Sequence, residues 1–241
     1  MEKMMRLDKY ITECSRYSRK EAKTLIGKGR VSVNGEIAKR PEQRVSNEDE
    51  IRLDRELLSY EEYEYYMLNK PAGVVSATTD LHDTTVVDLL DGVSKKELFP
   101  VGRLDKDTEG LLILTNNGEL AHRLLSPKYH VDKTYYVETD CVLTKEDIAA
   151  FKAGMDIGEK RETKPAKLEI LSEKRAYVTI SEGKYHQIKR MFQKCGKKVL
   201  YLKRISMGGV VLDESLKAGE FRLLTVGEIK AMKEGAKKYR G

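Results

Sequence analysis

GRLDKDTEGLLILTN, residues 102–116, places an arginine and an aspartate in a tight loop that leads directly into a hydrophobic run. The apolar residues 111–114 are too few to span a membrane and too continuous for an exposed strand. They predict a buried strand of a sheet, with Asp105 near its rim. A carboxylate held in that position is a candidate catalyst.

This loop contains three acidic residues. Asp105, Asp107 and Glu109 alternate ahead of Gly110, as in the first half of a calcium-binding EF-hand loop. The twelfth position of such a loop is Asn116 in place of the bidentate glutamate, and dense apolar residues follow Gly110. We therefore reject a calcium site, expect no bound metal, and interpret Asp107 and Glu109 as solvated loop acids.

The chain has 241 residues, enough for one small and one larger domain. It opens without a charged-then-apolar signal peptide, and no apolar run approaches the roughly 20 residues that a spanning helix needs. Cys14, Cys141 and Cys195 lie far apart without a CxxC pair, which favours neither a disulfide framework nor a zinc site. We expect a cytoplasmic monomer in which these cysteines are small core residues.

Positive charge is concentrated in two segments, although the formal net charge is only +6. Such clusters predict contacts with a polyanion, and a solvated helix face is the alternative for each. The first cluster comprises Arg16, Arg19, Lys20, Lys23, Lys28 and Arg30. The second comprises Lys184, Lys189, Arg190, Lys194, Lys197, Lys198, Lys203 and Arg204.

Residues 7–14 carry apolar side chains at helical spacing, and a second helix is predicted to begin at Ser18. Ser18 and Glu21 form a capping-box pattern, and Gly29 ends this helix. Residues 31–38 predict a hairpin, because the Asn-Gly pair at its centre suits the positive φ angles of a tight turn. A strand over residues 50–53 closes the unit, and the polar residues 55–62 predict a linker.

The rest of the chain alternates short strands and helices. Thr144 and Asp147 form a second capping box, which opens a helix that Gly154 ends. The irregular, strand-rich order favours an α+β fold with a mixed sheet over a doubly wound parallel one. Further helices are predicted over residues 85–90, 119–125 and 186–195, and strands over residues 63–69, 133–138, 167–171 and 176–181.

The segments RLDKYI and SRKEAKTLIGKGRVSVNG closely resemble the S4-like RNA-binding domain, over residues 5–54. In that family the basic helix and the hairpin grip structured RNA. The resemblance therefore implies that the first basic cluster binds RNA.

Four further motifs, NKPAGVV (69–75), GRLD (102–105), KTY (133–135) and EGKYHQIKRMF (182–192), resemble the successive motifs of the RsuA-type pseudouridine synthases. This resemblance implies an S4-like domain over residues 1–58 and a catalytic domain over residues 59–241. The catalytic domain would hold a mixed, largely antiparallel sheet with flanking helices. The reaction implied is isomerisation of uridine in ribosomal RNA, which needs no cofactor and fits the lack of a Walker loop or dinucleotide fingerprint.

The resemblance also implies catalytic roles for three residues. Asp105 would be the nucleophile, since a carboxylate can attack an electron-poor carbon and later leave. Tyr135 would stack on the flipped base, and its hydroxyl could take part in proton transfer. Lys189 would supply the cation beside Asp105, where many members of the family have arginine. Arg190 is the rival for that role, and helical spacing cannot choose between the two.

The remaining site residues are assigned to RNA binding and to organisation of the site. Arg103 would contact a phosphate or assist opening of the RNA. His186, Gln187 and Arg190 would bind RNA, with His186 and Gln187 organising the site. Lys70 and Pro71 are expected to shape a neighbouring loop without a catalytic role.

The segments HRLLSPKYHVDKTY (122–135) and ETKPA (162–166) look most like the small-subunit type within this branch. The expected partner is therefore 16S ribosomal RNA or the assembling small subunit, with the family target uridine-516. The first alternative is a large-subunit (23S) pseudouridine synthase. The second is a non-catalytic ribosome-assembly factor that uses both basic clusters only to bind RNA.

Overall fold

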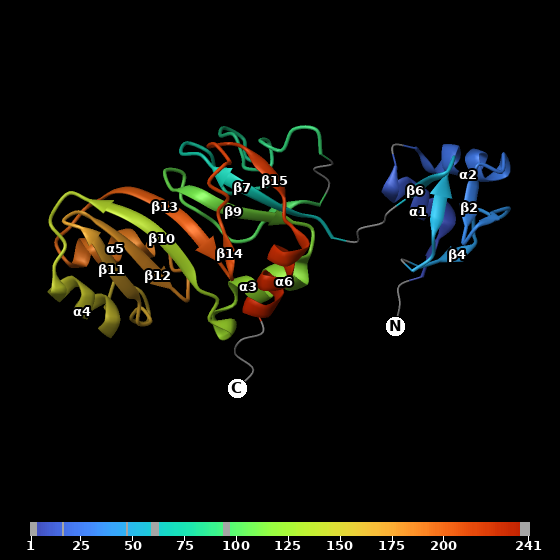
Figure 1. The fold of residues 1–241 in the computed structure, drawn as a ribbon. Helices are drawn as coiled ribbons and strands as arrows, with labels where there is room; N and C mark the ends of the chain where they lie inside the picture. The colour runs from blue at the N-terminus through green and yellow to red at the C-terminus, as the bar shows by residue number, and fades with distance from the viewer. Residues whose placement is uncertain (1–3, 16, 47, 59–62, 94–96, 237–241) are drawn as a thin grey trace. The chain divides into compact units, whose positions relative to one another are not determined.

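The computed structural model describes residues 4–15, 17–46, 48–58, 63–93 and 97–236. The chain divides into two compact units, Met1–Glu62 and Tyr63–Gly241 (Figure 1). Arg16, a predicted RNA-binding residue, lies outside the described residues.

The first unit combines two helices with short antiparallel strands around a core of its own. Four strands form one sheet in the order β3-β2-β5-β6, and β1 pairs with β4. The elements are β1 (Met5–Arg6), α1 (Leu7–Cys14), α2 (Arg19–Gly27), β2 (Val31–Val33), β3 (Glu36–Ile37), β4 (Arg44–Val45), β5 (Ile51–Leu53) and β6 (Glu56–Leu58).

Local chemistry sets the limits of α2 and the hairpin that follows. The Ser18 side chain caps the backbone of Glu21, whose carboxylate reaches back to Ser18, so both halves of the predicted capping box form. Gly29 follows the helix with a φ of 69°. Asn34 and Gly35 then take φ values of 52° and 85°, and β2 and β3 pair antiparallel across them. The predicted helix and hairpin are confirmed.

The predicted linker is wrong in its first part. Residues of β6 pair antiparallel with β5, so the unit ends with a hairpin in place of a single strand. The turn consists of Asp54 and Arg55, with φ of 49° and 77°. Asp54 tolerates a left-handed conformation, but arginine stands at the second position, where a glycine usually signals such a turn.

The second unit is built on one nine-stranded sheet with helices packed against it (Figure 1). Its main path runs β11-β12-β10-β13-β9-β7-β15, with β14 beside β13 and β8 beside β9. Every pair is antiparallel except β13 with β9, so the predicted mixed, largely antiparallel α+β fold is confirmed. The strands are β7 (Tyr65–Lys70), β8 (Phe99–Pro100), β9 (Glu109–Thr115), β10 (Lys133–Thr139), β11 (Lys167–Ser172), β12 (Arg175–Ile180), β13 (Val199–Met207), β14 (Val210–Val211) and β15 (Phe221–Leu223). The helices are α3 (Gly118–Leu125), the 3-10 helix η1 (Pro127–Tyr129), α4 (Lys145–Ala153), α5 (Gln187–Lys194) and α6 (Val226–Gly235).

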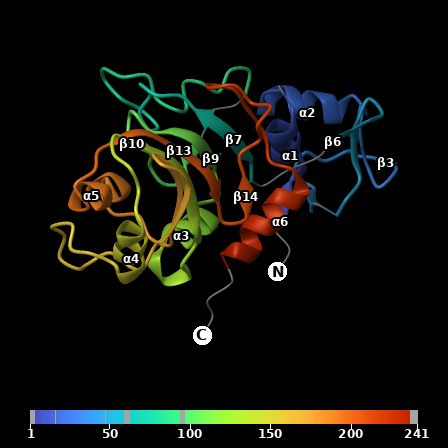
Figure 2. The ribbon, with the colours of Figure 1, turned by 60° about the vertical axis from the view of Figure 1, so that its left-hand side comes forward.

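The sheet is covered on both faces at β7 and β9, which explains their unbroken apolar sequences. Leu112 and Leu114 face the larger core, to which α4 and α5 contribute. Leu111 and Ile113 face the smaller core, which α3 and α6 cover (Figure 2). The buried strand predicted from residues 111–114 is thus confirmed. No described helix is long and apolar enough to cross a membrane.

Two predictions fail in the second unit. Residues 85–90 form turns in place of a helix. The Thr85 hydroxyl and amide both bind the Asp88 carboxylate at 2.8 Å, which closes a local turn, while Leu90 still packs into the core. Cys141 is exposed, whereas Cys14 and Cys195 are partly buried, so the three are not uniformly core residues.

The parallel contact between β9 and β13 requires a glycine. Gly110 lies opposite Arg204 with a φ of 98°, and a Cβ there would overlap the Arg204 carbonyl oxygen. The Arg204 side chain is 1% exposed and donates from Nε to the Leu111 carbonyl at 2.7 Å. Arg204 therefore cannot contact phosphate, which corrects its place in the second basic cluster.

A buried lysine holds the loop between β8 and β9 through hydrogen bonds to main-chain carbonyls. Lys70, at the end of β7, is fully buried and donates from Nζ to the carbonyls of Pro71, Lys106 and Thr108 at 3.0, 3.3 and 2.9 Å. Burial lowers the pKa of Lys70 to about 8, because it disfavours the charged ammonium. The predicted loop-shaping role of Lys70 thus has a direct geometric basis.

We predict that Lys70→Met lowers the free energy of unfolding by about 2 kcal/mol, because three carbonyls, that of Thr108 buried and the other two partly buried, lose a charged donor. Urea unfolding measures the loss. Hydrogen exchange of the Gly73 amide, which donates to Lys106 O at 2.7 Å, should accelerate as the loop loosens. Lys106→Met is the control, since the half-exposed Lys106 side chain forms a surface ion pair with Asp83, and its loss should cost less than about 0.5 kcal/mol. An equal loss of unfolding free energy in the two variants would contradict the role of Lys70 in holding the loop.

Lys133 gives a second, pH-dependent prediction. Burial, and then the charge of Arg204, lower its pKa from 10.5 to about 8. Between these values the unfolded chain binds more protons, so this group makes the free energy of unfolding rise with pH. Lys133→Met should remove up to about 3 kcal/mol of that rise between pH 8 and pH 10.5, measured by urea unfolding. Lys145 is exposed, so Lys145→Met should leave the rise of unfolding free energy with pH unchanged. If Lys145→Met removed as much of the rise as Lys133→Met, the assignment of the rise to Lys133 would be refuted.

Candidate active site

Asp105 stands in a loop whose backbone is fixed on several sides. The Ser76 hydroxyl donates to the Leu104 carbonyl at 2.9 Å and accepts from the Leu104 amide at 3.0 Å. The Thr108 amide donates to the Asp105 carbonyl at 3.0 Å, which closes the loop just before β9. The Asp105 side chain remains 25% exposed and lines a cavity, so its carboxylate is accessible while its backbone is held.

Lys189 of α5 binds that carboxylate. Its Nζ lies 2.9 Å from Oδ2 of Asp105 and 2.6 Å from Oδ1 of Asp107. Burial alone would lower the pKa of Lys189, but the two carboxylates outweigh it and raise the pKa above its usual value. Lys189 thus keeps its charge and holds Asp105 as an oriented carboxylate.

Arg190, the rival cation, is committed elsewhere. Its guanidinium pairs with Glu159 at 2.8 Å and donates to the carbonyls of Tyr185, at 3.1 Å, and Ile157. It braces the loop before α5 against residues 157–159. Among the described residues the cation in contact with Asp105 is therefore Lys189, and Arg190 does not occupy the RNA-facing position predicted for it.

His186 and Gln187 have different surroundings. His186 precedes α5 with a φ of 48°, a left-handed conformation that costs a non-glycine residue about 1 kcal/mol or more. Its Nε2 lies 3.5 Å from Oδ1 of Asp105. Gln187 is only 4% exposed, and its amide binds Glu182 at 3.0 Å and the Lys184 amide at 2.9 Å. Gln187 therefore organises the loop, as expected, and it also lines the cavity described below, so its contact with RNA stays a prediction.

Tyr135 completes the same cavity from β10. Its ring is 7% exposed and packs in the larger core, whereas Tyr136 faces the opposite side of the sheet against Tyr177 and Tyr201, as strand alternation predicts. The cavity has a volume of about 90 Å³. Its lining includes Arg103, Asp105, Thr108, Tyr135, His186 and Lys189. The structure thus brings together side chains that lie far apart in the sequence.

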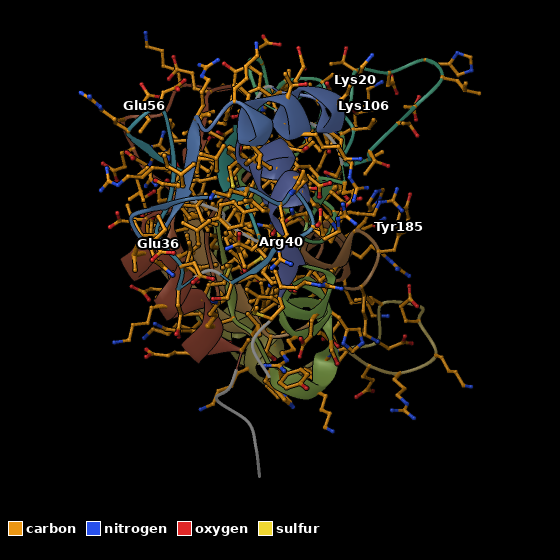
Figure 3. The ribbon with its side chains drawn as sticks, turned by 90° about the vertical axis from the view of Figure 1, so that its right-hand side faces the viewer. Lys20, Glu36, Arg40, Glu56, Lys106 and Tyr185 are labelled. Carbon is orange, nitrogen blue, oxygen red and sulfur yellow. The ribbon has the colours of Figure 1, made fainter. Side chains whose placement is uncertain are left out.

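The first basic cluster is exposed where the structure describes it. Lys20, Lys23 and Lys28 project into solvent from α2 and its end, and Figure 3 labels Lys20. Arg19 and Arg30 are exposed but form ion pairs, with Asp8 at 3.4 Å and with Asp54. The cluster therefore presents free lysines beside two arginines already held by carboxylates.

Part of the second cluster lies inside the protein. Lys197 is 12% exposed at its side chain and pairs with Asp147, which is 5% exposed, at 2.8 Å. Together with Arg204 it is unavailable to a phosphate. The charge run reflects structural ion pairing at these positions, and the prediction of phosphate contacts is wrong for both.

Two participants were not recognised in the sequence. Asp107 was read as a solvated loop acid, yet it shares Lys189 with Asp105, and this contact lowers its pKa. Thr108 lines the cavity with a buried hydroxyl that has no hydrogen-bond partner among the described residues. Asp105 and Asp107 are two positions apart in the sequence, and this spacing is the signal that both carboxylates could contact one cation.

Comparisons with known proteins identify both units. The model of the RNA pseudouridylate synthase family matches residues 64–194, and the S4 domain model matches residues 5–51. The uncharacterized RNA pseudouridine synthase YtzG of Bacillus subtilis is 48% identical over 236 residues, covering 95% of this chain and 99% of the relative. Ribosomal small subunit pseudouridine synthase A of Haemophilus influenzae is 46% identical over 230 residues, covering 95% and 99%.

A solved structure agrees with the sequence relatives. A pseudouridylate synthase crystal structure matches with a TM-score of 0.68 and 46% identity, covering 95% of this chain and 99% of the other. The resemblance found in the sequence motifs is therefore confirmed. The chain belongs to the RNA pseudouridylate synthase family of isomerases and carries an S4 domain over residues 5–51.

Proposed function

We propose that this protein converts one specific uridine of small-subunit ribosomal RNA, uridine-516 of 16S RNA, into pseudouridine, with Asp105 as the nucleophile. The observation that carries the proposal is the ion pair of 2.9 Å between Lys189 and Asp105 in a cavity that Tyr135 also lines. Relatives named for the small ribosomal subunit, at 46% and 42% identity, favour that RNA over the large-subunit alternative.

The reaction rearranges the target nucleotide without adding or removing atoms. The bond between the ribose C1′ and the uracil N1 breaks, the base turns, and a bond forms between C1′ and C5. C5 gives up its proton, and N1 gains one. Asp105 forms a temporary bond to a carbon of the sugar or the base and is released at the end. No redox change or phosphate transfer takes place, so the proposal requires no cofactor.

The surrounding groups have separate tasks in this proposal. Lys189 fixes and neutralises the Asp105 carboxylate, which must approach a polyanion. Tyr135 offers an aromatic face to the uracil after the nucleotide leaves the stack, which offsets part of the cost of extrusion. Arg103, exposed at the mouth of the cavity, is suited to a phosphate.

Residues 1–58 form the proposed RNA-anchoring domain, and residues 59–241 the catalytic domain. The S4 match over residues 5–51 and the exposed lysines of α2 support the first assignment. Lys20, Lys23 and Lys28 would contact phosphates of folded RNA, with Arg19 and Arg30 beside them. Such contacts anchor an RNA without reading its sequence.

We predict that Asp105→Asn binds small-subunit ribosomal RNA with near wild-type affinity and forms pseudouridine at least about 1000-fold more slowly, because the amide is a poor nucleophile. Filter binding and pseudouridine mapping of the transcript measure the two quantities. Asp107→Asn is the matched control, with the same change two residues away on the same lysine. Normal product from Asp105→Asn would remove Asp105 from the mechanism.

The target RNA is tested by mapping pseudouridine in ribosomal RNA from cells with and without the protein. Loss of one site in 16S RNA supports the proposal, whereas loss in 23S RNA supports the large-subunit alternative. Unchanged maps together with defective subunit assembly would favour a non-catalytic assembly factor.

A double variant tests the anchoring domain, Lys20→Ala with Lys23→Ala. Its affinity for the ribosomal transcript should fall, and the slope of log affinity against log salt should become shallower by about 1 to 2, because two phosphate contacts release fewer counterions. The control is Lys145→Ala with Lys152→Ala, two exposed lysines of α4. An unchanged slope in the α2 variant would mean that these lysines do not face the RNA.

A further inference from the structure

Tyr185 exposes an unusual amount of aromatic surface beside the cavity. Its residue surface is 72% exposed, far more than that of Tyr135 at 7%. The ring stacks on His186 with a centroid distance of 3.8 Å and an interplanar angle of 21°. One face of the Tyr185 ring is therefore covered by the imidazole, and most of the remaining surface of this residue is open to solvent.

The stacked pair of Tyr185 and His186 lies beside the loop that carries Asp105. His186 places Nε2 3.5 Å from the Asp105 carboxylate, and the cavity lining includes His186. Tyr185 thus forms the outer layer of a stack whose inner layer contacts the proposed nucleophile. A group placed on the open face of Tyr185 would lie next to the target nucleotide and outside the cavity.

The backbone around Tyr185 is held on both sides, which makes the exposed ring a fixed surface. Arg190 donates to the Tyr185 carbonyl at 3.1 Å. The Lys184 amide donates to the buried Gln187 side chain at 2.9 Å, and the Lys184 ammonium donates to the Arg161 carbonyl. An aromatic ring supported in this way loses little conformational freedom when a ligand stacks on it.

The surroundings of the ring suit a nucleic acid base. Lys184 directly precedes Tyr185 in the same loop, so a phosphate close to the ring meets positive charge. Unpaired bases stack on exposed aromatic side chains, and such stacking tolerates any base because each has a planar face.

We propose that Tyr185 is a stacking platform for an unpaired base of the RNA that neighbours the target uridine, an inference that rests on the proposed function. Tyr135 then serves the extruded base inside the cavity, and Tyr185 holds the flanking base outside it. The two tyrosines would keep the strand open on the two sides of the extruded nucleotide.

The chain contains no tryptophan, which allows a direct optical test. Tyr185→Trp introduces a single indole fluorophore at the platform, and Tyr63→Trp introduces one at another exposed tyrosine, 38% exposed, outside the cavity lining. Titration with small-subunit ribosomal transcript should quench the emission of Tyr185→Trp at least about twofold and leave that of Tyr63→Trp nearly unchanged. Equal quenching, or none in Tyr185→Trp, would overturn the platform.

Kinetics provide the second arm. Tyr185→Leu keeps an apolar side chain without an aromatic face, and should raise KM for the transcript about tenfold while kcat changes less than about threefold. Tyr185→Phe should behave like the wild type, because it retains the ring. Tyr63→Leu controls for the loss of an exposed tyrosine. A Tyr185→Phe variant as impaired as Tyr185→Leu would overturn the proposal.

The two proposals fail in different ways. If the wild-type protein forms no pseudouridine in ribosomal RNA, the proposed function is wrong, and the fluorescence arm alone decides whether Tyr185 stacks on RNA. If product forms normally but Tyr185→Leu keeps its KM, the platform is wrong and the proposed function stands.

Discussion

One ammonium group joins the two halves of the site. Lys189 binds Asp105 at 2.9 Å and Asp107 at 2.6 Å, and these partners lie more than 80 residues away along the chain. The contact requires α5 to pack beside the loop that precedes β9. That placement depends in turn on the parallel pairing of β9 with β13, which Gly110 permits. The sheet order, the glycine and the ion pair are thus successive conditions for one oriented carboxylate.

Elements governed by neighbouring residues were predictable from the sequence. The capping box at Ser18 and the Asn34-Gly35 turn depend on atoms within a few positions, and they form as expected. At Thr144 the amide donates to the Asp147 carboxylate at 2.7 Å, which is the return half of the predicted box. The β5–β6 hairpin does not follow from the sequence, because Arg55 adopts a left-handed angle at the position where a glycine usually signals such a turn. The helix predicted over residues 85–90 is wrong because Thr85 and Asp88 close a local turn, whose apolar side chains still reach the core.

The site divides in the same way. The motifs pointed to Asp105, Tyr135 and Lys189, which share a cavity, although their catalytic roles remain proposals. Helical spacing could not separate Lys189 from Arg190, because the choice is made by Glu159 and Ile157, which belong to another segment. A run of charged residues in the sequence also does not show which of them are buried. Arg204 and Lys197 are predicted to bind phosphate, but in the fold they bind the Leu111 carbonyl and the Asp147 carboxylate.

The supports of the Asp105 loop bind main-chain atoms. Lys70 holds the carbonyls of Lys106 and Thr108, and Ser76 holds the amide and carbonyl of Leu104. The shape of the loop is therefore independent of the side chains at its exposed positions. This separation makes the loop evolvable, because the charge presented at Lys106, whose side chain pairs with Asp83 away from Lys189, can change among descendants, or be redesigned, while Asp105 keeps its position.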